Sequence, residues 1–599
     1  MASLISAVSW VARGVSAQQP TKYVLDDEEL QRVSALARID VEDARKELER
    51  AHEAARQMGK GTEGDDGDDG EWVDEDGDAG TPVPEDGDGA PDDSMDVDEP
   101  VVPVEKKNKD DLSAYNLDDY DNDIEVTNGP FTNIKGLTYY KDNNDDPYIT
   151  LKDGDNGDED ERDELQVLPT DNLLVAAKTE DEISQLEIYV YDALNENLYV
   201  HHDLMLPNFP LCLEWLDFPP SQSQSPSGGP SRTHGNYIAV GTLDPEIEIW
   251  SLDTLDALYP DALLGRPDAT KAHVPVPAGT GKKKKKKTKH RTTSPYYHVD
   301  AVLSLSWNKH QRNLLASASA DRTVKLWDLN RGTGNANGAI SVGAGDAGGD
   351  SGNGAIRSFD SLHSDKIQSV AWNPSPSSPS ILLTASYDRT LLTLDTRAPA
   401  SSVGALLGAD PEAIRWDPFE PESFFVSLEN GLVLNFDARM LVTNPRTNSE
   451  TARARWTLAA HDGAVSGLDV NPHIRGCLAT GGTDKLVKVW NVAEQVGDSE
   501  KRNVSLVTSR ELGVGKVFSV GWCPDEPLTL SAAGSKAKMQ IWDVSANGGA
   551  RKAFAGKLKA AGRVLRERTQ GEDGEGGGGG GVVGVVSDGE DSEDEDDGE

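Results

Sequence analysis

The spacing of apolar residues changes near Phe131. From Phe131 to about residue 545, short apolar runs alternate with clusters of Gly, Asp, Asn and Pro, a pattern typical of β-strands joined by tight turns. Upstream, apolar residues recur every three or four positions between Asp26 and Met58, which predicts an amphipathic helix. Because its apolar stripe is rich in Ala, this is either a solvated helix or one that lies in a partner's groove.

One unit recurs through the strand-rich region. It begins with His, reaches Trp nine residues later and ends on an apolar-Trp-Asp strand, most clearly from His298 to Leu329. Two further copies begin at His363 and His461, and four degenerate copies bring the total to seven. Nine of the twelve tryptophans occupy the two periodic positions, so the repeat is not a chance pattern.

The repeat predicts an all-β fold, a seven-bladed WD-repeat β-propeller over residues 131–545. Without its evident inserts this region has about 41 residues per unit, as expected for a four-stranded blade. The inserts are expected at residues 141–164, 219–234, 255–295, 330–356 and 440–456. The flanking segments are an N-terminal motif and helix (1–60), an acidic linker (61–130), a basic helix (546–570) and a Gly-rich acidic tail (571–599).

A buried polar network is expected to tie the strands of each regular blade. The His before the blade, a Ser or Thr on the second strand, an Asp in the next turn and the Trp indole N–H satisfy one another, since each is costly to bury alone. Two units carry the full set, namely His298, Ser317, Asp321 and Trp327, and His461, Thr480, Asp484 and Trp490. Such periodicity argues against a Ser/His/Asp catalytic triad, of which a hydrolase carries one, and no catalytic residue is expected.

Two blades depart from this pattern. Leu394 replaces the Trp of blade four, and blade five has Phe436 there and no His. We expect apolar packing to hold these blades and expect them to be less rigid. The ring itself needs a closing strand, and the N-terminal region offers Leu137–Tyr140 as a candidate outer strand of the last blade.

Charge is distributed unevenly along this acidic chain. The formal net charge is −46, with 18 acidic residues and no Lys, Arg or His in residues 61–100, and 9 acids in the last 13 residues. Both segments are expected to be disordered, because they cannot bury enough apolar surface. Three widely spaced cysteines fit a reducing compartment. No cofactor, zinc spacing or membrane-spanning run is found, and the N-terminus lacks the basic start of a secretion signal.

The N-terminal residues are specific enough to indicate a family. Trp10, Val11, Arg13 and Gly14 are followed by a Lys22-Tyr23-x-Leu25 run that ends in four acids. Together with the periodic tryptophans, these motifs resemble the periodic tryptophan protein one family, over most of the chain. The resemblance implies a nuclear, nucleolar protein that acts in ribosomal-RNA processing and early assembly of the large ribosomal subunit. Its expected partners are ribosome-assembly factors and pre-ribosomal RNA, with the chain a monomer in a larger complex.

Two basic stretches are candidate contacts for RNA. Clustered cations attract phosphate independently of sequence, and the first stretch would also suit a nuclear import receptor. The first comprises Lys282, Lys283, Lys284, Lys285, Lys286, Lys287, Lys289 and Arg291, and the second Arg551, Lys552, Lys557, Lys559, Arg563, Arg566 and Arg568. Phe554, Leu558 and Leu565 share one face of the second stretch, so a helix packed on the propeller edge is the alternative.

Other functions stay open. Asp395-Thr-Arg397 and Asp437-Ala-Arg439 resemble the paired signature of substrate receptors of cullin-RING ubiquitin ligases, although both lack the preceding Trp. A propeller face that reads a basic histone tail is a third possibility. In the acidic tail, Ser587 and Ser592 resemble sites of acid-directed kinases, where phosphorylation adds about −1.5 to −2 charge.

Overall fold

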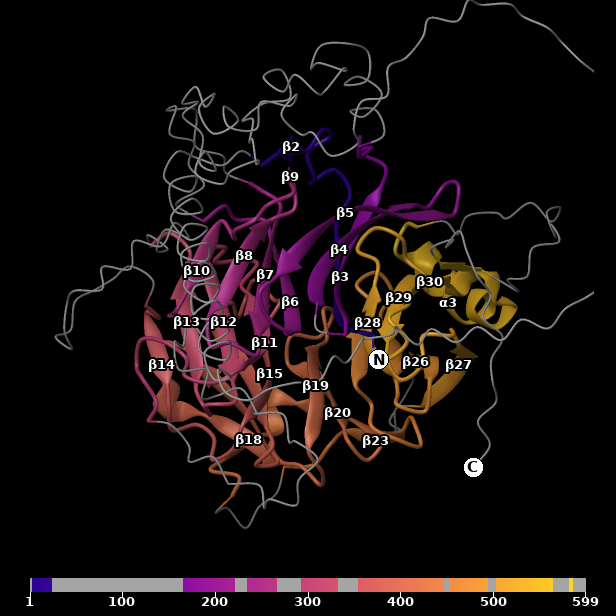
Figure 1. The fold of residues 1–599 in the computed structure, drawn as a ribbon. Helices are drawn as coiled ribbons and strands as arrows, with labels where there is room; N and C mark the ends of the chain where they lie inside the picture. The colour runs from indigo at the N-terminus through magenta and orange to yellow at the C-terminus, as the bar shows by residue number, and fades with distance from the viewer. Residues whose placement is uncertain are drawn as a thin grey trace, which may run out of the picture. The chain divides into compact units, whose positions relative to one another are not determined.

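A computed structural model describes residues 3–23, 165–181, 183–220, 234–266, 292–331, 354–446, 452–493, 503–563 and 581–584. Within these residues the strands form seven sheets of four or five strands, arranged as propeller blades (Figure 1). The predicted seven-bladed all-β fold is therefore confirmed. The expected helix at 26–58, the acidic linker, most of each insert except 440–456 and nearly all of the tail lie outside the described residues.

Each blade is an antiparallel sheet whose strands run outwards from the ring centre in chain order. The innermost strands are β1 (Leu4–Val11), β6 (Pro210–Leu216), β11 (Val302–Trp307), β15 (Ile367–Trp372), β19 (Pro411–Trp416), β24 (Gly467–Val470) and β28 (Val517–Trp522). The second strands are β3 (Asn172–Glu180), β7 (Tyr237–Thr242), β12 (Leu314–Ser319), β16 (Ile381–Ser386), β20 (Ser423–Leu428), β25 (Cys477–Gly481) and β29 (Thr529–Gly534).

The third and fourth strands complete the blades. The third strands are β4 (Ile183–Asp192), β8 (Ile247–Ser251), β13 (Val324–Asp328), β17 (Thr390–Asp395), β21 (Leu432–Asp437), β26 (Leu486–Val492) and β30 (Met539–Asp543). The fourth strands are β5 (Asn197–Leu206), β10 (Ala262–Leu264), β14 (Arg357–Phe359), β18 (Val403–Leu406), β23 (Trp456–Ala459), β27 (Val504–Glu511) and β31 (Val582–Gly584). We number the blades one to seven in this order.

A few elements lie outside this four-strand pattern. β22 (Val442–Thr443) leaves blade five and pairs with β18, so it becomes a fifth strand of blade four. β2 (Thr21–Lys22) pairs in parallel with β9 (Thr254–Leu255). The helix α3 (Gly548–Ala560) follows blade seven, and three 3₁₀ turns lie at Pro399–Ser401, Ala438–Met440 and Val544–Ala546.

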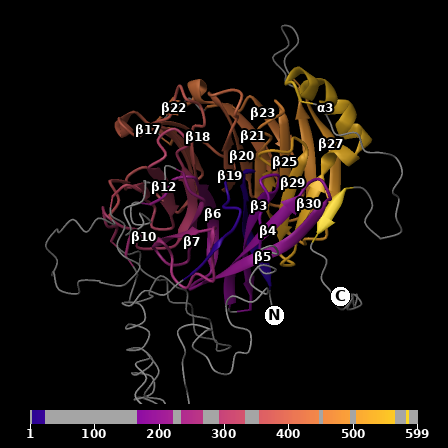
Figure 2. The same cartoon turned by 90° about the horizontal axis from the view of Figure 1, so that it is seen from above.

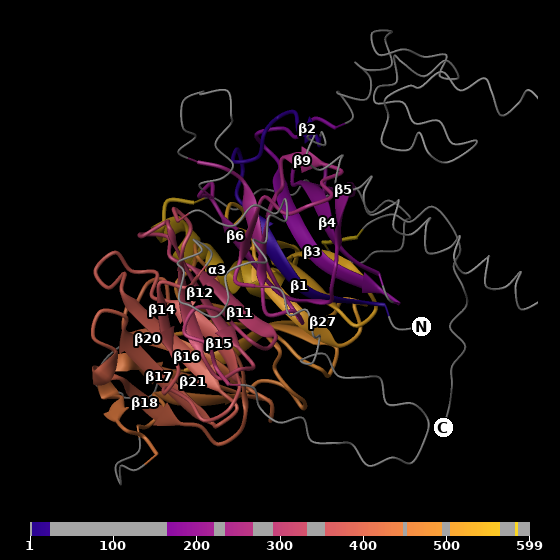
Figure 3. The same ribbon diagram turned by 60° about the vertical axis from the view of Figure 1, so that its left-hand side comes forward.

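The ring extends beyond the expected limits of 131–545. The N-terminal β1 is the innermost strand of blade one, and it contacts the innermost strands of blades two and seven (Figure 3). The outer strand of blade seven is β31, so the expectation that Leu137–Tyr140 fills that place is wrong. Both termini therefore contribute strands. Two expected inserts also contain blade strands, since β10 lies within 255–295 and β22 within 440–456.

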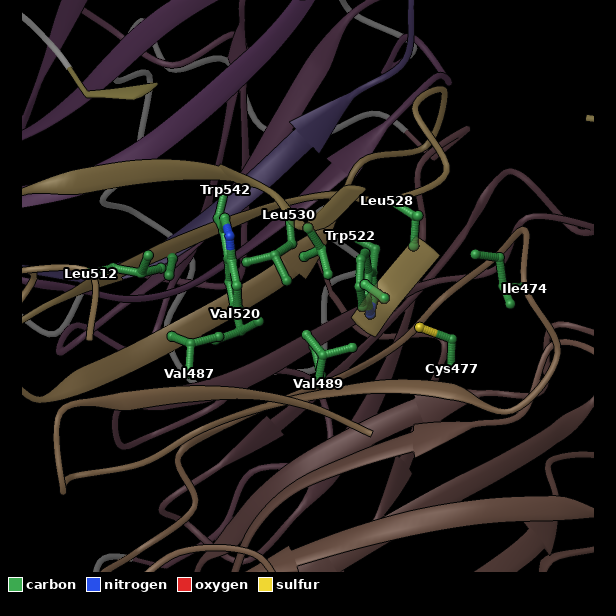
Figure 4. Close-up of a cluster of buried hydrophobic side chains, with 14 of the residues drawn as sticks. Ile474, Cys477, Val487, Val489, Leu512, Val520, Trp522, Leu528, Leu530 and Trp542 are labelled. Atoms are coloured by element: carbon green, nitrogen blue, oxygen red, sulfur yellow. The ribbon is translucent and has the colours of Figure 1, made fainter. Parts of the chain in front are cut away.

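Buried apolar side chains form seven clusters in the described part of the chain, one at each interface between neighbouring blades. Figure 4 shows the cluster between blades six and seven, where Val487 and Val489 of blade six face Trp522 and Trp542 of blade seven. The seven interfaces rather than one central core hold the apolar surface, which is why a missing blade or strand would expose two clusters at once.

Candidate interaction surfaces and what builds them

The 20-residue step between periodic tryptophans is a register across the strands of a blade. Trp307 on β11 pairs with Leu315 on β12, and Leu315 pairs with Trp327 on β13. Both tryptophans of a blade therefore flank the same residue of the second strand. The register repeats in blade one, where Trp10 pairs with Leu174 and Leu174 with Tyr189. Trp10 is thus the first periodic tryptophan of blade one, a tenth member of the set.

Blades three and six carry the complete polar lock, by which we mean the hydrogen-bonded His, hydroxyl, Asp and Trp group. In blade three, the Nε2 and Nδ1 atoms of His298 lie 2.7 Å from Ser317 Oγ and 2.9 Å from Asp321 Oδ2. Trp327 Nε1 donates to Ser317 Oγ at 2.8 Å. Burial would raise the pKa of Asp321, but the facing His298 and a hydrogen bond from Thr323 hold it well below its usual range.

The same contacts recur in blade six. His461 lies 2.8 Å from Thr480 Oγ1 and 2.9 Å from Asp484 Oδ1, and Trp490 Nε1 donates to Thr480 Oγ1 at 2.9 Å. Burial lowers the pKa of His461 although Asp484 opposes that shift. Two equivalent groups at corresponding places in two blades, with the His side chains and the hydroxyl residues fully buried, fit a structural role, because buried polar groups need such partners.

Blade four keeps more of the lock than we expected. His363 lies 2.8 Å from Thr384 Oγ1 and 3.3 Å from Asp388 Oδ2, so only the tryptophan is missing. Arg446, from the segment that follows β22, also bonds Asp388. The expectation of purely apolar packing is therefore wrong for blade four. It agrees with blade five, where Phe436 stacks on Phe424 with ring centroids 5.7 Å apart.

Blades one and two use a different acceptor, which sequence reasoning missed. In blade two, Trp250 Nε1 donates to Glu248 Oε2 at 2.9 Å, from two residues away on the same strand. In blade one, the Tyr189 hydroxyl donates to Glu187 in the same arrangement. Burial raises the pKa of Glu248 to about 7. We refer to these pairs as carboxylate locks. Glu followed two residues later by an aromatic residue, as in Glu248-Ile-Trp250, is the signal that could have revealed them.

The residues of the N-terminal motif close the ring. Trp10 Nε1 donates to Gly521 O of blade seven at 3.0 Å, and Val11 is fully buried. Arg13 donates its backbone N–H to Asp525 at 2.9 Å and places its guanidinium 2.8 Å from Glu526. The chain then turns at Gly14, whose φ of +71° suits a residue without Cβ.

The rest of this segment continues over blade two. Ala17 N donates to Asp253 Oδ1 at 3.1 Å, and Thr21 N donates to the Asp253 carbonyl at 2.9 Å before β2 pairs with β9. Residues 3–23, which we name the N-terminal strap, thus contact blades seven, one and two. The motif that resembles a family signature in sequence therefore closes the ring. We refer to this closure by the N-terminal strap as the joint of the ring.

A central cavity of about 670 Å³ is lined by all seven innermost strands. Two of its three carboxylates accept hydrogen bonds: Glu214 accepts from Trp307 N at 2.9 Å and Asp469 from Trp522 N at 2.8 Å. Burial raises the pKa of both groups. Arg415 belongs to blade five, and its Nε atom lies 3.5 Å from Asp469 Oδ1 of blade six. These polar groups join neighbouring blades, and no group of metal-ligating side chains occurs within the described residues.

The second basic stretch divides into two kinds of residue. Phe554 and Leu558 of α3 are buried in the cluster between blades six and seven, which agrees with a helix packed on the propeller. Lys557 Nζ donates to Arg475 O and to Asn491 Oδ1, both at 2.8 Å, and Arg551 Nε donates to Ser545 O at 2.5 Å. Lys552, Lys559 and Arg563 are exposed. The helix ends at Ala560, so it is shorter than expected.

The remaining sequence candidates are placed as follows. Lys282–Lys287, Lys289, Arg291, Arg566, Arg568, Ser587 and Ser592 lie outside the described residues. Arg397 and Arg439 are 77% and 66% exposed, and each pairs with its own Asp at 2.7 Å, Asp395 and Asp437. The two turns are therefore alike, as their sequences suggested. None of the helices that the structure describes has both the length and the apolar character needed to cross a bilayer.

Comparison with known proteins identifies two of the blades as members of a known repeat family. Residues 290–328 and 453–491, which contain the two complete locks, match the family model "WD domain, G-beta repeat". The chain is 38% identical to an uncharacterized WD repeat-containing protein of Schizosaccharomyces pombe over 95% of this chain and 96% of that protein. It is 34% identical to Periodic tryptophan protein 1 of Saccharomyces cerevisiae, over 95% and 92% of the two chains. The Drosophila melanogaster homolog is 27% identical, over 89% and 92%.

Proposed function

Because this chain belongs to the periodic tryptophan protein 1 family of WD-repeat proteins, we propose that it is a non-enzymatic scaffold in nucleolar pre-rRNA processing and large-subunit assembly. The observation that carries the proposal is the strap. The residues that resemble the family signature, Trp10 to Gly14, build the joint of the ring, so the resemblance rests on the architecture and not on WD repeats in general. A propeller offers a rigid platform for several partners at once.

The polar clusters of the described residues support a binding role. The locks and the cavity carboxylates of Glu214 and Asp469 are engaged in hydrogen bonds between strands and blades, so they serve the fold. Exposed cations are the groups that could meet RNA: Lys552 and Lys559 lie on α3, and Arg563, whose guanidinium donates to Asp525 O at 3.0 Å, lies just beyond it. Their contact with phosphate would be independent of sequence and sensitive to salt.

Depletion of the protein tests the assembly role. Cells that lose it should accumulate precursors of large-subunit rRNA and contain fewer free large subunits. Northern blots of the precursors and sucrose gradients measure both. Unchanged precursors with normal free large subunits would refute the assembly role.

Crosslinking with identification of the bound RNA tests the second part. Pre-ribosomal RNA of the large subunit should be recovered, and recovery should fall several-fold when Lys552, Lys559 and Arg563 are changed to Gln. A matched control changes exposed Lys366 and Lys485 of blades four and six, which should leave recovery intact. Recovery of ligase components dependent on Arg397 and Arg439, or of histones alone, would favour those alternatives instead.

A further inference from the structure

Three lysines gather at one end of blade seven. Lys516 lies in the loop before β28, and Lys536 and Lys538 lie in the turn between β29 and β30. Loop and turn are held together, because Ser535 N donates to Lys516 O at 3.0 Å and Lys516 N donates to Ser535 Oγ at 2.9 Å. All three side chains are exposed. We refer to them as the lysine patch.

The lysine patch has no counter-charge in the described residues. None of the three ammonium groups takes part in an ion pair there, whereas several other surface cations of this acidic protein do, including Arg389, Arg455 and Arg475. Exposed lysines without an ion pair in the described residues also occur singly, as at Lys366 and Lys485. Here, however, three lie on one loop and one turn of a chain of net charge −46, and together they attract an anionic segment within reach.

The strand β31 directs the acidic C-terminus towards this patch. β31 is antiparallel to β30, with Val582 opposite Trp542 and Gly584 opposite Gln540. The chain therefore leaves Gly584 in the direction of the β29–β30 turn. Gln540, the residue opposite Gly584, is two residues from Lys538. In Figure 2, β31 is the short yellow strand beside β30. The segment Ser587–Glu599 begins three residues later and holds 9 acids and no cation.

We propose that the acidic segment Ser587–Glu599 docks on the lysine patch of its own chain. A tether this short gives an effective concentration on the order of millimolar or above, which offsets the weakness of single exposed ion pairs, roughly 0.2–1 kcal/mol each. The docked segment covers the patch, so other polyanions reach these lysines only after displacing it. The docking does not depend on the ribosomal role.

Carbodiimide coupling of the full-length protein tests this directly, because it joins amines to carboxylates that are already in contact. At about 50 mM salt, Lys516, Lys536 and Lys538 should couple to tail acids roughly tenfold more often than distant exposed lysines, and about 0.5 M salt should remove the difference by screening. Lys366 and Lys485 are the internal controls, since they occupy corresponding loops of blades four and six. Mass spectrometry of the linked peptides gives the frequencies.

Two further arms make the outcome decisive. In a mixture of isotopically light and heavy protein, the links should stay within one chain; links that join two chains would assign the tail to a second copy. The second arm measures the fluorescence anisotropy of a label attached within Ser587–Glu599. When Lys516, Lys536 and Lys538 are changed to Gln, the anisotropy should fall to the value of the free peptide. Changing Lys366 and Lys485 to Gln should leave it unchanged. Equal coupling at all exposed lysines would overturn the proposal.

Discussion

Blades two and three bury the same tryptophan at the same register but give it different acceptors. Trp327 of blade three donates to the hydroxyl of Ser317, which is also bonded to His298. Trp250 of blade two donates to the carboxylate of Glu248, which accepts from no other donor among the described residues. A shared neutral acceptor tolerates the loss of one partner, whereas a buried charge with a single donor does not. Blades two and three therefore differ in the kind of acceptor that they offer the buried tryptophan.

The difference follows the chain. The carboxylate locks lie in blades one and two, two of the three blades that the N-terminal strap contacts. The complete His-based locks lie in blades three and six, each formed from one continuous stretch of sequence. Blade one has to accept its innermost strand from a distant part of the chain, so it depends on contacts with its neighbours more than the regular blades do.

Removing the N-terminal strap should lower the stability of the protein more than any other predicted change. Deletion of residues 2–23 takes away β1, with the fully buried Ile5 and Val11, and it breaks two blade interfaces. Loss of one such side chain costs about 2–5 kcal/mol, so loss of the whole strand should exceed the roughly 5–15 kcal/mol that stabilises a domain. We expect aggregation or no cooperative melting transition in scanning calorimetry.

A matched deletion and a rescue sharpen that experiment. Removing residues 585–599, which follow β31, should leave the transition in place. Adding a peptide of residues 3–23 during refolding of the strap deletion should restore part of it, since the peptide supplies β1 and its contacts with blades seven, one and two. A strap deletion that melts like the intact chain would show that β1 is dispensable for ring closure.

The two acceptors predict unequal costs for one substitution. Trp250→Phe leaves the Glu248 carboxylate buried without a donor, which should cost about 3 kcal/mol or more at pH 8 beyond the lost ring volume. Trp327→Phe loses the same volume but leaves Ser317 bonded to His298, so its extra cost should be about 1 kcal/mol. Both tryptophans are 1% exposed, which makes the pair well matched. Equal shifts in melting temperature would contradict the distinction between the locks.

The sequence alone predicted the regular blades well, for a physical reason. In blades three and six, the lock, the register and the step between tryptophans lie within about 45 consecutive residues, so the pattern is visible by eye. Leu394 in blade four hid a largely intact lock, because Trp is the most conspicuous member of the set but only one of four. The register, not the residue type, identifies the blade.

The joint of the ring could not be found in this way. Trp10 and its partner Leu174 are separated by 163 residues of different composition, so no window contains both. β31 is a short Val-Val-Gly segment after a run of glycines, with no alternation to mark it. The carboxylate locks were missed because Glu on a strand is ordinarily read as a solvent-facing residue. Ring closure is a long-range property that a local pattern does not encode.

The last and smallest effect is the pH dependence of the two locks, which should have opposite signs. The pKa of Glu248, raised by burial to about 7 from an ordinary 4.5, means that its contribution to stability is full below pH 4.5 and is lost as the pH rises through 7. The pKa of Asp321 is lowered, so its contribution is present above about pH 4 and is lost in acid.

Glu248→Gln should therefore raise the melting temperature at pH 8 and leave it unchanged at pH 4.5, because Gln keeps the Trp250 acceptor without the charge. Asp321→Asn should lower it at pH 7 and converge with the parent protein in acid. If Glu248→Gln is destabilising at both pH values, the carboxylate does more in blade two than accept from Trp250.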